Sequence, residues 1–217
     1  MEKVLPHQVV AIYKGHDTAW YAQAPADLSE FNLPQNAFVI TFAGRNRPHK
    51  GIDFLVDAAR YLPPETPVFF LLLGRLENDR KLRAKIDASP MKDHFILAGF
   101  RNNAPAIFAA SDAFIMPSTK REGLSRAVIE AMSSGTVPIV TDVGGLPELV
   151  ADGESGFVVP PMDSRAIAGA ILKLAQHPEL KKQMGKAAKD RIQNEFNVAA
   201  TVLRTKEMFE QMMAEKC

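Results

Sequence analysis

Cysteine is almost absent from this sequence, whose single cysteine, Cys217, is its last residue. One thiol excludes an internal disulfide and a cysteine-based zinc site, and it fits a reducing cytosol. An excess of charge of one sign is also absent, since 26 basic residues face 25 acidic ones. A nearly neutral chain offers no broad field to attract nucleic acid, so no nucleic-acid partner is expected. The apolar run at 68–73 is too short to span a bilayer.

Three common phosphate-binding signatures are missing as well. No Gly-x-Gly-x-x-Gly follows the first predicted strand, which argues against a dinucleotide-dependent dehydrogenase. No Gly-x-x-x-x-Gly-Lys-Ser/Thr is present, which argues against a P-loop protein. The sequence contains no Asp-x-Asp pair, and its five histidines do not have the spacing of metal ligands. No metal site is therefore predicted. A bound diphosphate would therefore have to be neutralised by Arg, Lys and helix dipoles.

From residue 37 onward, short β-rich runs alternate with amphipathic segments of helical length. The runs lie at 38–42, 68–73, 95–98, 113–116, 137–141 and 156–159. Several are continuously apolar, which is typical of strands covered on both faces. Alternating strands and helices of this kind predict a parallel sheet with helices on both faces. We therefore expect an α/β fold with a single doubly wound, Rossmann-like, six-stranded parallel sheet.

Basic residues follow the first predicted strand, in the region where an open parallel sheet binds its ligands. Arg45, Arg47 and Lys50 lie in a loop that contains no acidic residue, which indicates an anionic ligand. Arg47 is best interpreted as a solvated loop charge. Arg45 lies at the strand end, and Lys50 opens the next helix, where a cation opposes the helix dipole. Cations that are locally unfavourable, at the edge of the sheet where a ligand binds, indicate a function, and we predict one for both Arg45 and Lys50.

The fourth predicted strand is followed by Glu122 and Gly123, just before a helix expected at about Leu124. Gly123 permits close approach of a ligand, and the free N–H groups of the helix's first turn can bind an anion. Glu130 lies eight residues after Glu122. Both acids also have a structural interpretation, because Glu122 suits a helix N-terminus and Glu130 can pair with Arg126.

Taken in order, these segments resemble the retaining GT-B glycosyltransferases that are often called group 1 or family 4. The resemblance covers about residues 38–163 and follows the family's order and spacing. The matching segments are 43–51, 111–118, 122–132, 135–138, 144–148 and 153–156. One such motif would be weak evidence, whereas six in register are strong.

The resemblance implies catalytic roles for Arg45, Lys50 and Glu122. Arg45 and Lys50 match the family's Arg/Lys pair on the diphosphate of the sugar donor. Glu122 matches the acid that holds the hydroxyls of the donor sugar, and Glu130 matches the acid that binds ribose hydroxyls.

Further donor-binding residues are implied around these. Gly123 and Leu124 offer backbone amides near the donor, and Ser125 stands where the family commonly has glycine. Phe100 and Arg101 match the loop whose backbone meets the nucleotide base. No metal ligand and no prosthetic group are implied.

The resemblance also implies how the chain is divided. The Lys14-Gly15-His16-Asp17 segment is similar to the family's interdomain segment, which follows an N-terminal acceptor-binding domain that is missing from this chain. We expect an interdomain linker and leading strand at 1–36, with the strand at 7–13. A nucleotide-sugar-binding Rossmann-like domain is expected at 37–195, and a C-terminal helix at 196–217. Together they would form the C-terminal half of a GT-B enzyme.

The implied reaction is hexosyl transfer with retention, from a UDP-, GDP- or ADP-linked sugar to a glycan or lipid-linked acceptor. It would be metal-independent and would serve polysaccharide or lipopolysaccharide biosynthesis, in the cytoplasm or at the inner face of the membrane. The chain alone is expected to bind donor without transferring sugar. Two alternatives stay open: a noncatalytic nucleotide-binding subunit of a split enzyme, and a sugar-nucleotide epimerase of the same architecture.

Overall fold

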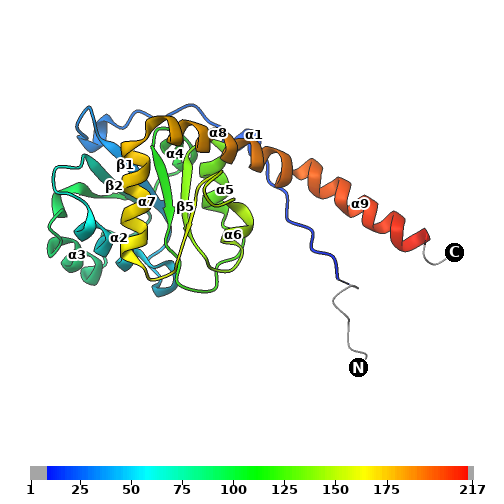
Figure 1. Cartoon of the computed structure of the whole chain (residues 1–217), viewed down its shortest axis with the longest axis horizontal. Coiled ribbons are helices and arrows are strands. Elements are labelled where there is room, and N and C mark those ends of the chain that lie inside the picture. Colours follow the sequence, from blue (N-terminus) through cyan, green and yellow to red (C-terminus); the bar gives the residue numbers. More distant parts are fainter. Residues whose placement is uncertain (1–8, 215–217) are drawn as a thin grey trace, which may run out of the picture.

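Six parallel strands form one sheet in a computed structural model that describes residues 9–214 (Figure 1). The strand order is β3-β2-β1-β4-β5-β6, so the chain winds outward from the centre in both directions. The strands are β1 (Phe38–Ala43), β2 (Val68–Leu73), β3 (Phe95–Gly99), β4 (Ala113–Met116), β5 (Val137–Thr141) and β6 (Phe157–Val159). The predicted fold class is confirmed, and the predicted strands differ from these by one residue at most.

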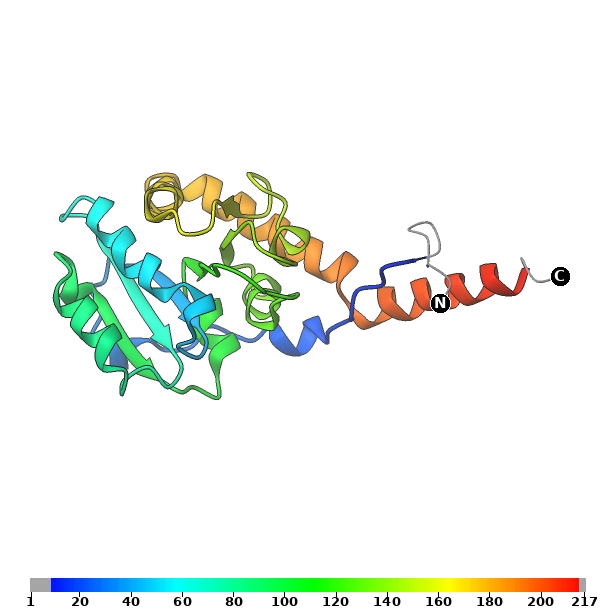
Figure 2. The same cartoon turned by 90° about the horizontal axis from the view of Figure 1, so that it is seen from below.

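Helices cover both faces of the sheet, with α2 and α7 on one face and α4 and α5 on the other (Figures 1 and 2). The α-helices are α1 (Thr18–Tyr21), α2 (Ile52–Ala58), α3 (Arg80–Asp87), α4 (Ala104–Ala109), α5 (Arg126–Ser133), α6 (Leu146–Leu149), α7 (Ser164–Gln176), α8 (Pro178–Glu195) and α9 (Val198–Ala214). Short 3-10 turns are η2 (Ser29–Phe31), η3 (Pro48–Lys50), η4 (Ala59–Tyr61) and η5 (Lys92–His94).

The strands are buried on both faces, as their continuous apolar runs predicted. Every residue of β4 and β5 is buried, and the rings of Phe108 and Phe114 meet edge to face with centroids 5.0 Å apart. Burial of one such side chain stabilises the fold by roughly 1.5–3 kcal/mol. Asp163 caps α7 by accepting from the Ala166 backbone N–H at 2.9 Å.

The leading strand expected at 7–13 does not form in the residues that the structure describes. Residues 9–13 are not in a strand, and residues 7 and 8 lie outside the described part. Its last residue, Tyr13, contacts α9, where the Thr201 hydroxyl donates to the Tyr13 carbonyl at 2.7 Å. Val9 and Val10 therefore stay exposed, because no strand edge is there to pair with them.

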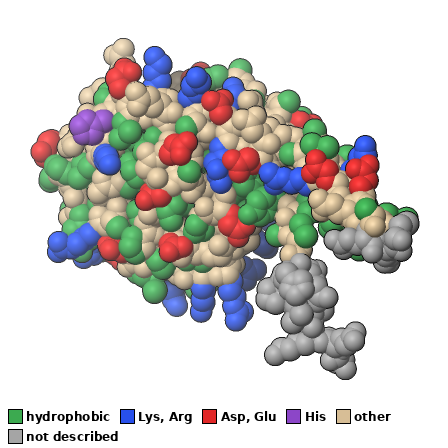
Figure 3. Space-filling model, turned by 45° about the vertical axis from the view of Figure 1, so that its right-hand side comes forward, with side chains coloured by type: hydrophobic (Ala, Val, Ile, Leu, Met, Phe, Trp, Pro, Cys, Tyr) green, Lys and Arg blue, Asp and Glu red, His purple; other side chains and the backbone are tan. Residues whose placement is uncertain are grey.

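The C-terminal helix α9 projects away from the sheet and buries none of its residues (Figures 1 and 2). It begins at Val198, inside the predicted segment 196–217, and residues 215–217 lie outside the described part. Apolar and charged side chains are interspersed on the surface around it (Figure 3). Its exposed apolar side chains include Val202, Phe209 and Met213. No helix within residues 9–214 is both long and apolar enough to cross a membrane.

Candidate functional site

The loops after β1 and β4 are joined at the carboxyl edge of the sheet by close backbone contact. Gly51 lies in the left-handed region with φ of 66°, and a Cβ there would lie 1.9 Å from the Pro117 carbonyl oxygen. The Thr119 backbone N–H donates to the His49 carbonyl at 2.8 Å. Only glycine fits at position 51, where the two loops are in contact. This contact places Lys50 over the loop that carries Glu122.

The loop after β5 holds the Glu122 backbone from the other side. The Gly145 backbone N–H donates to the Glu122 carbonyl at 3.0 Å. Gly144 has φ of 58°, and a Cβ there would lie 1.8 Å from the same carbonyl oxygen. The helix α6 follows directly after the two glycines. Their contact with the loop after β4 also fixes the position of Glu122 between two neighbouring strands.

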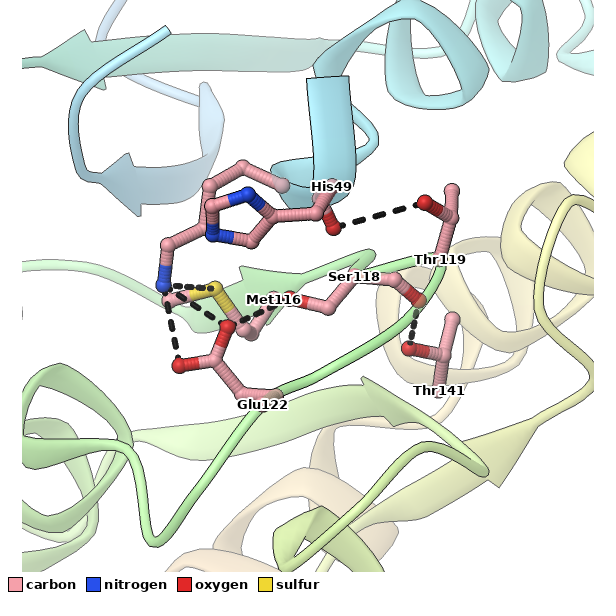
Figure 4. A network of polar contacts seen from close by, with 7 residues as sticks. His49, Met116, Ser118, Thr119, Glu122 and Thr141 are labelled. Carbon is pink, nitrogen blue, oxygen red and sulfur yellow. Dashed lines mark hydrogen bonds and ion pairs between the residues drawn. The ribbon is translucent and has the colours of Figure 1, made fainter. Parts of the chain in front are cut away.

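Lys50 and Glu122 form an ion pair at the centre of this cluster. Figure 4 labels Glu122 and shows the dashed contacts of its carboxylate. The Lys50 ammonium lies 2.9 and 2.8 Å from the two carboxylate oxygens of Glu122. The two side chains are 19% and 11% exposed, so the pair is largely shielded from water but still reachable. Lys50 ends η3 rather than opening α2, which begins two residues later. The structure thus places Lys50 next to Glu122. The resemblance had implied that Lys50 binds the diphosphate of the donor and that Glu122 binds its sugar.

A buried hydroxyl completes the cluster. The Ser118 side chain is fully buried, and its Oγ donates to Glu122 Oε2 at 2.9 Å. The Ser118 carbonyl in turn accepts a hydrogen bond from the Thr141 hydroxyl, at the end of β5 (Figure 4). Neither hydroxyl was singled out from the sequence, because the first contact depends on how the loop after β4 folds and the second on β5 lying beside β4.

The N-terminus of α5 opens beside Glu122. The helix begins at Arg126, two residues later than expected, and the Ser125 side chain makes no capping hydrogen bond. Its first backbone N–H groups are therefore available to an anion. Space at Gly123 is open, since no atom lies within 4 Å of the position a Cβ would take. Leu124 is half-buried and Ser125 is buried.

Glu130 lies on α5 with a side chain that is 13% exposed. Its Oε1 lies 3.2 Å from Arg126 Nε, so the ion pair considered from the sequence does form. Burial raises the pKa of Glu130, and Arg126 opposes that rise. The short helix α1 packs beside α5, where burial and, next, the charge of Glu130 raise the pKa of Tyr21. Sequence reasoning missed Tyr21.

The other predicted residues are placed differently. Arg45 is exposed at the end of β1. Phe100 is 65% exposed after β3. The Arg101 guanidinium lies over the Phe31 ring and 2.9 Å from Glu30 Oε2, while its Nε donates to the Ala98 carbonyl. Arg101 thus ties the segment before β1 to the end of β3 and does not join the Lys50–Glu122 pair.

Two further observations limit what the site can hold. No three His, Cys, Asp or Glu side chains within residues 9–214 are placed to share a metal ion. A cavity of about 510 Å³ lies at the amino edge of the sheet, beside Phe38 and Pro67, so it is remote from the cluster. The carboxyl edge is therefore where a cation, a carboxylate and a free helix N-terminus converge.

The family model for glycosyl transferases group 1 matches residues 24–191. The chain belongs to this family. It is 31% identical over 97% of its length to the UDP-Gal:alpha-D-GlcNAc-diphosphoundecaprenol alpha-1,3-galactosyltransferase of Escherichia coli, of which it covers 56%. It spans about half the length of the curated relatives that it matches.

Solved structures of other proteins share the fold. HepE of Anabaena in complex with UDP superposes with a TM-score of 0.83 at 27% identity, over 92% of this chain and 57% of that one. HepE has also been solved with UDP-glucose. The C-terminal domain of the group 1 protein LpcC of Francisella tularensis is matched over its entire length, with a TM-score of 0.73, 25% identity and 85% of this chain covered. The family and the fold that the sequence predicted are both confirmed.

Proposed function

We propose that this chain is the donor-binding domain of a retaining glycosyltransferase. It would transfer a hexose from a nucleotide-diphosphate sugar to a glycan or a lipid-linked acceptor. The observation that carries this proposal is the shielded Lys50–Glu122 pair beside the uncapped N-terminus of α5. A cation and free N–H groups suit a diphosphate, and a carboxylate within the same cluster suits sugar hydroxyls. The UDP and UDP-glucose complexes of HepE support this proposal.

The donor would lie across the carboxyl edge of the sheet. Lys50, Arg45 and the first N–H groups of α5 would bind the diphosphate. Glu122 would accept from the sugar hydroxyls, and Gly123 leaves open space beside it. Glu130 would accept from the ribose, about one turn along α5. The exposed loop at Phe100 would meet the base.

The chemical demand on these groups is to stabilise the departing diphosphate. Negative charge grows on the leaving oxygen as the bond to the anomeric carbon breaks. Lys50 and the N–H groups of α5 are fixed in place before the reaction, so they stabilise that charge without first reorganising. Glu122 would act as a sugar-binding group. The acceptor would attack the anomeric carbon from the same face as that from which the diphosphate leaves. This geometry retains the anomeric configuration without a covalent intermediate.

The acceptor site would lie in a separate N-terminal domain. The support for this is that the chain covers 56% of its E. coli relative, and that it matches the isolated C-terminal domain of LpcC over that domain's entire length.

Calorimetric titration with UDP, GDP and ADP tests the proposal, with Lys50→Ala beside the wild type. A charged hydrogen bond is worth about 1.5–3 kcal/mol, so Lys50→Ala should weaken the best nucleotide roughly 10- to 150-fold. The matched control is Lys85→Ala, because Lys85 pairs with Asp57 at 2.7 Å, away from the carboxyl edge. Titrations are repeated in EDTA, where affinity should persist. Equal losses in the two variants, or no nucleotide binding at all, would contradict the proposal.

A further inference from the structure

Both the side chain and the backbone of Ser118 are held in place. Ser118 follows β4 and is fully buried, so its side chain has little room to change rotamer. Its carbonyl accepts from the Thr141 hydroxyl at the end of the neighbouring strand β5. The Oγ is thus a rigid donor, and it is aimed at Glu122 Oε2 at 2.9 Å.

The two groups that contact the Glu122 carboxylate among residues 9–214 act differently on it. Lys50 lies within hydrogen-bond distance of both oxygens, and an ammonium on a flexible stem attracts a carboxylate without fixing its plane. Ser118 contacts Oε2 alone, and so determines which oxygen is turned inward. When Lys50 binds a diphosphate, Ser118 still donates to the Glu122 carboxylate and keeps its orientation.

We infer that Ser118 is a positioning residue that orients Glu122 to accept a hydroxyl of the donor sugar at Oε1. The inference rests on the proposed function, since it needs a sugar nucleotide at this edge. Ser118 would act through Glu122, without touching the sugar itself. Loss of the hydroxyl should therefore affect binding of the sugar portion and spare the nucleotide.

Another buried serine shows what a merely structural hydroxyl does in this fold. Ser133 is also fully buried, and its Oγ donates to the Ile129 carbonyl at 2.7 Å within its own helix. Its partner is a neutral backbone group. Ser118 donates instead to a charged side chain that also contacts Lys50, and hydrogen bonds to charged groups are the stronger kind. Ser133 is therefore the matched control for Ser118.

The experiment measures calorimetric affinities for UDP, UDP-glucose and UDP-galactose in the wild type, Ser118→Ala and Ser133→Ala. In Ser118→Ala, the tighter-binding sugar nucleotide should lose about tenfold in affinity, while UDP changes less than twofold. Ser133→Ala should leave all three affinities unchanged. Ser118→Cys keeps the shape of the side chain at a slightly larger volume but has only a weak donor, so it should show the same selective loss and serves if the alanine variant does not fold.

The outcomes separate this inference from the proposed function. Equal loss of UDP and sugar nucleotide in the Ser118 variants, or no loss in either, overturns the role of Ser118 and leaves the donor site standing. Wild-type protein that binds UDP but neither sugar nucleotide overturns the sugar assignment to Glu122, and this inference with it. Wild-type protein that binds no nucleotide, UDP, GDP or ADP, overturns both proposals.

Discussion

The Lys50 ammonium contacts both carboxylate oxygens of Glu122, at 2.9 and 2.8 Å. The cation proposed for the diphosphate is thus already neutralised by the acid proposed for the sugar. A nucleotide diphosphate has to share Lys50 with Glu122, whereas a sugar nucleotide offers Glu122 new hydroxyl partners in return. This pairing would make the site favour the sugar nucleotide over the product nucleotide.

Glu122→Gln should therefore bind UDP more tightly and UDP-sugars less well. Exposed ion pairs are worth up to about 1 kcal/mol, and the Lys50–Glu122 pair is more shielded than those, so release of Lys50 should improve UDP affinity by roughly fivefold or more. Competition titrations with UDP and UDP-glucose measure the change. Asp57→Asn is the control, because it frees Lys85 from a comparable pair on another part of the surface. If Glu122→Gln weakens UDP, Glu122 does not compete with the diphosphate for Lys50.

Gly144→Ala should be strongly destabilising, because the added Cβ would meet the Glu122 carbonyl oxygen at 1.8 Å and the residue has φ of 58°. Left-handed strain and overpacking together cost roughly 2–5 kcal/mol. Gly169→Ala on α7 is the control, since no atom lies within 4 Å of its added Cβ. That change should stabilise by about 0.5–1 kcal/mol through helix propensity. Urea unfolding measures both, and similar free energies of unfolding would show that the loop after β5 can shift away from Glu122.

Glu130→Gln should stabilise the fold at neutral pH and have no such effect in acid. Burial raises the pKa of Glu130 above the ordinary glutamate value of 4.5, so the folded state favours the protonated acid. Stability from this group is present below pH 4.5 and is lost as pH rises through the folded-state pKa. The neutral amide avoids that loss.

Urea unfolding at several pH values between 4 and 8 follows the difference between Glu130→Gln and the wild type. The difference should grow as pH rises through the titration of Glu130. Glu195→Gln is the control, since Glu195 also pairs with an arginine four residues away but is more exposed. A stability difference that is constant over this range would mean that burial of Glu130 carries no penalty. The same Glu130 variant should bind UDP more weakly if Glu130 holds the ribose.

The strands could be predicted almost to the residue because each is a short apolar run bounded by turn residues, as at Phe38 and Val137. Lys50 could be chosen because parallel strands deliver their following residues to one edge, whereas Glu122 was chosen through the resemblance to the family. Their mutual ion pair could not be predicted, since it joins residues 72 apart in sequence and depends on β1 lying beside β4.

The contacts of Arg101 are a second feature that could not be predicted from the sequence. The resemblance implied that the backbone of its loop meets the base, and gave no sign that its guanidinium would pair with Glu30, 71 residues earlier. Residues 14–35 form only short helical turns, so no periodic pattern in the sequence indicated where Glu30 would dock. Tyr21 was missed for the same reason, because its position depends on α1 packing against α5.

The last prediction concerns transfer itself: the chain should bind a sugar nucleotide yet transfer no sugar. Transfer requires the acceptor's nucleophile to be held at the anomeric carbon, and positioning of this kind contributes about 7–11 kcal/mol in favourable cases. The proposed acceptor domain corresponds to the part of the E. coli relative that this chain does not cover.

The assay incubates the chain with a donor that it binds, together with lipid-linked and oligosaccharide acceptors, and detects labelled product. The E. coli relative with UDP-galactose and GlcNAc-diphosphoundecaprenol is the positive control. Slow hydrolysis of the donor should persist, because water needs no acceptor site, and Lys50→Ala should slow it by removing charge stabilisation from the leaving group. Sustained glycosyl transfer at the rate of the control enzyme would instead show that the acceptor site lies within these 217 residues.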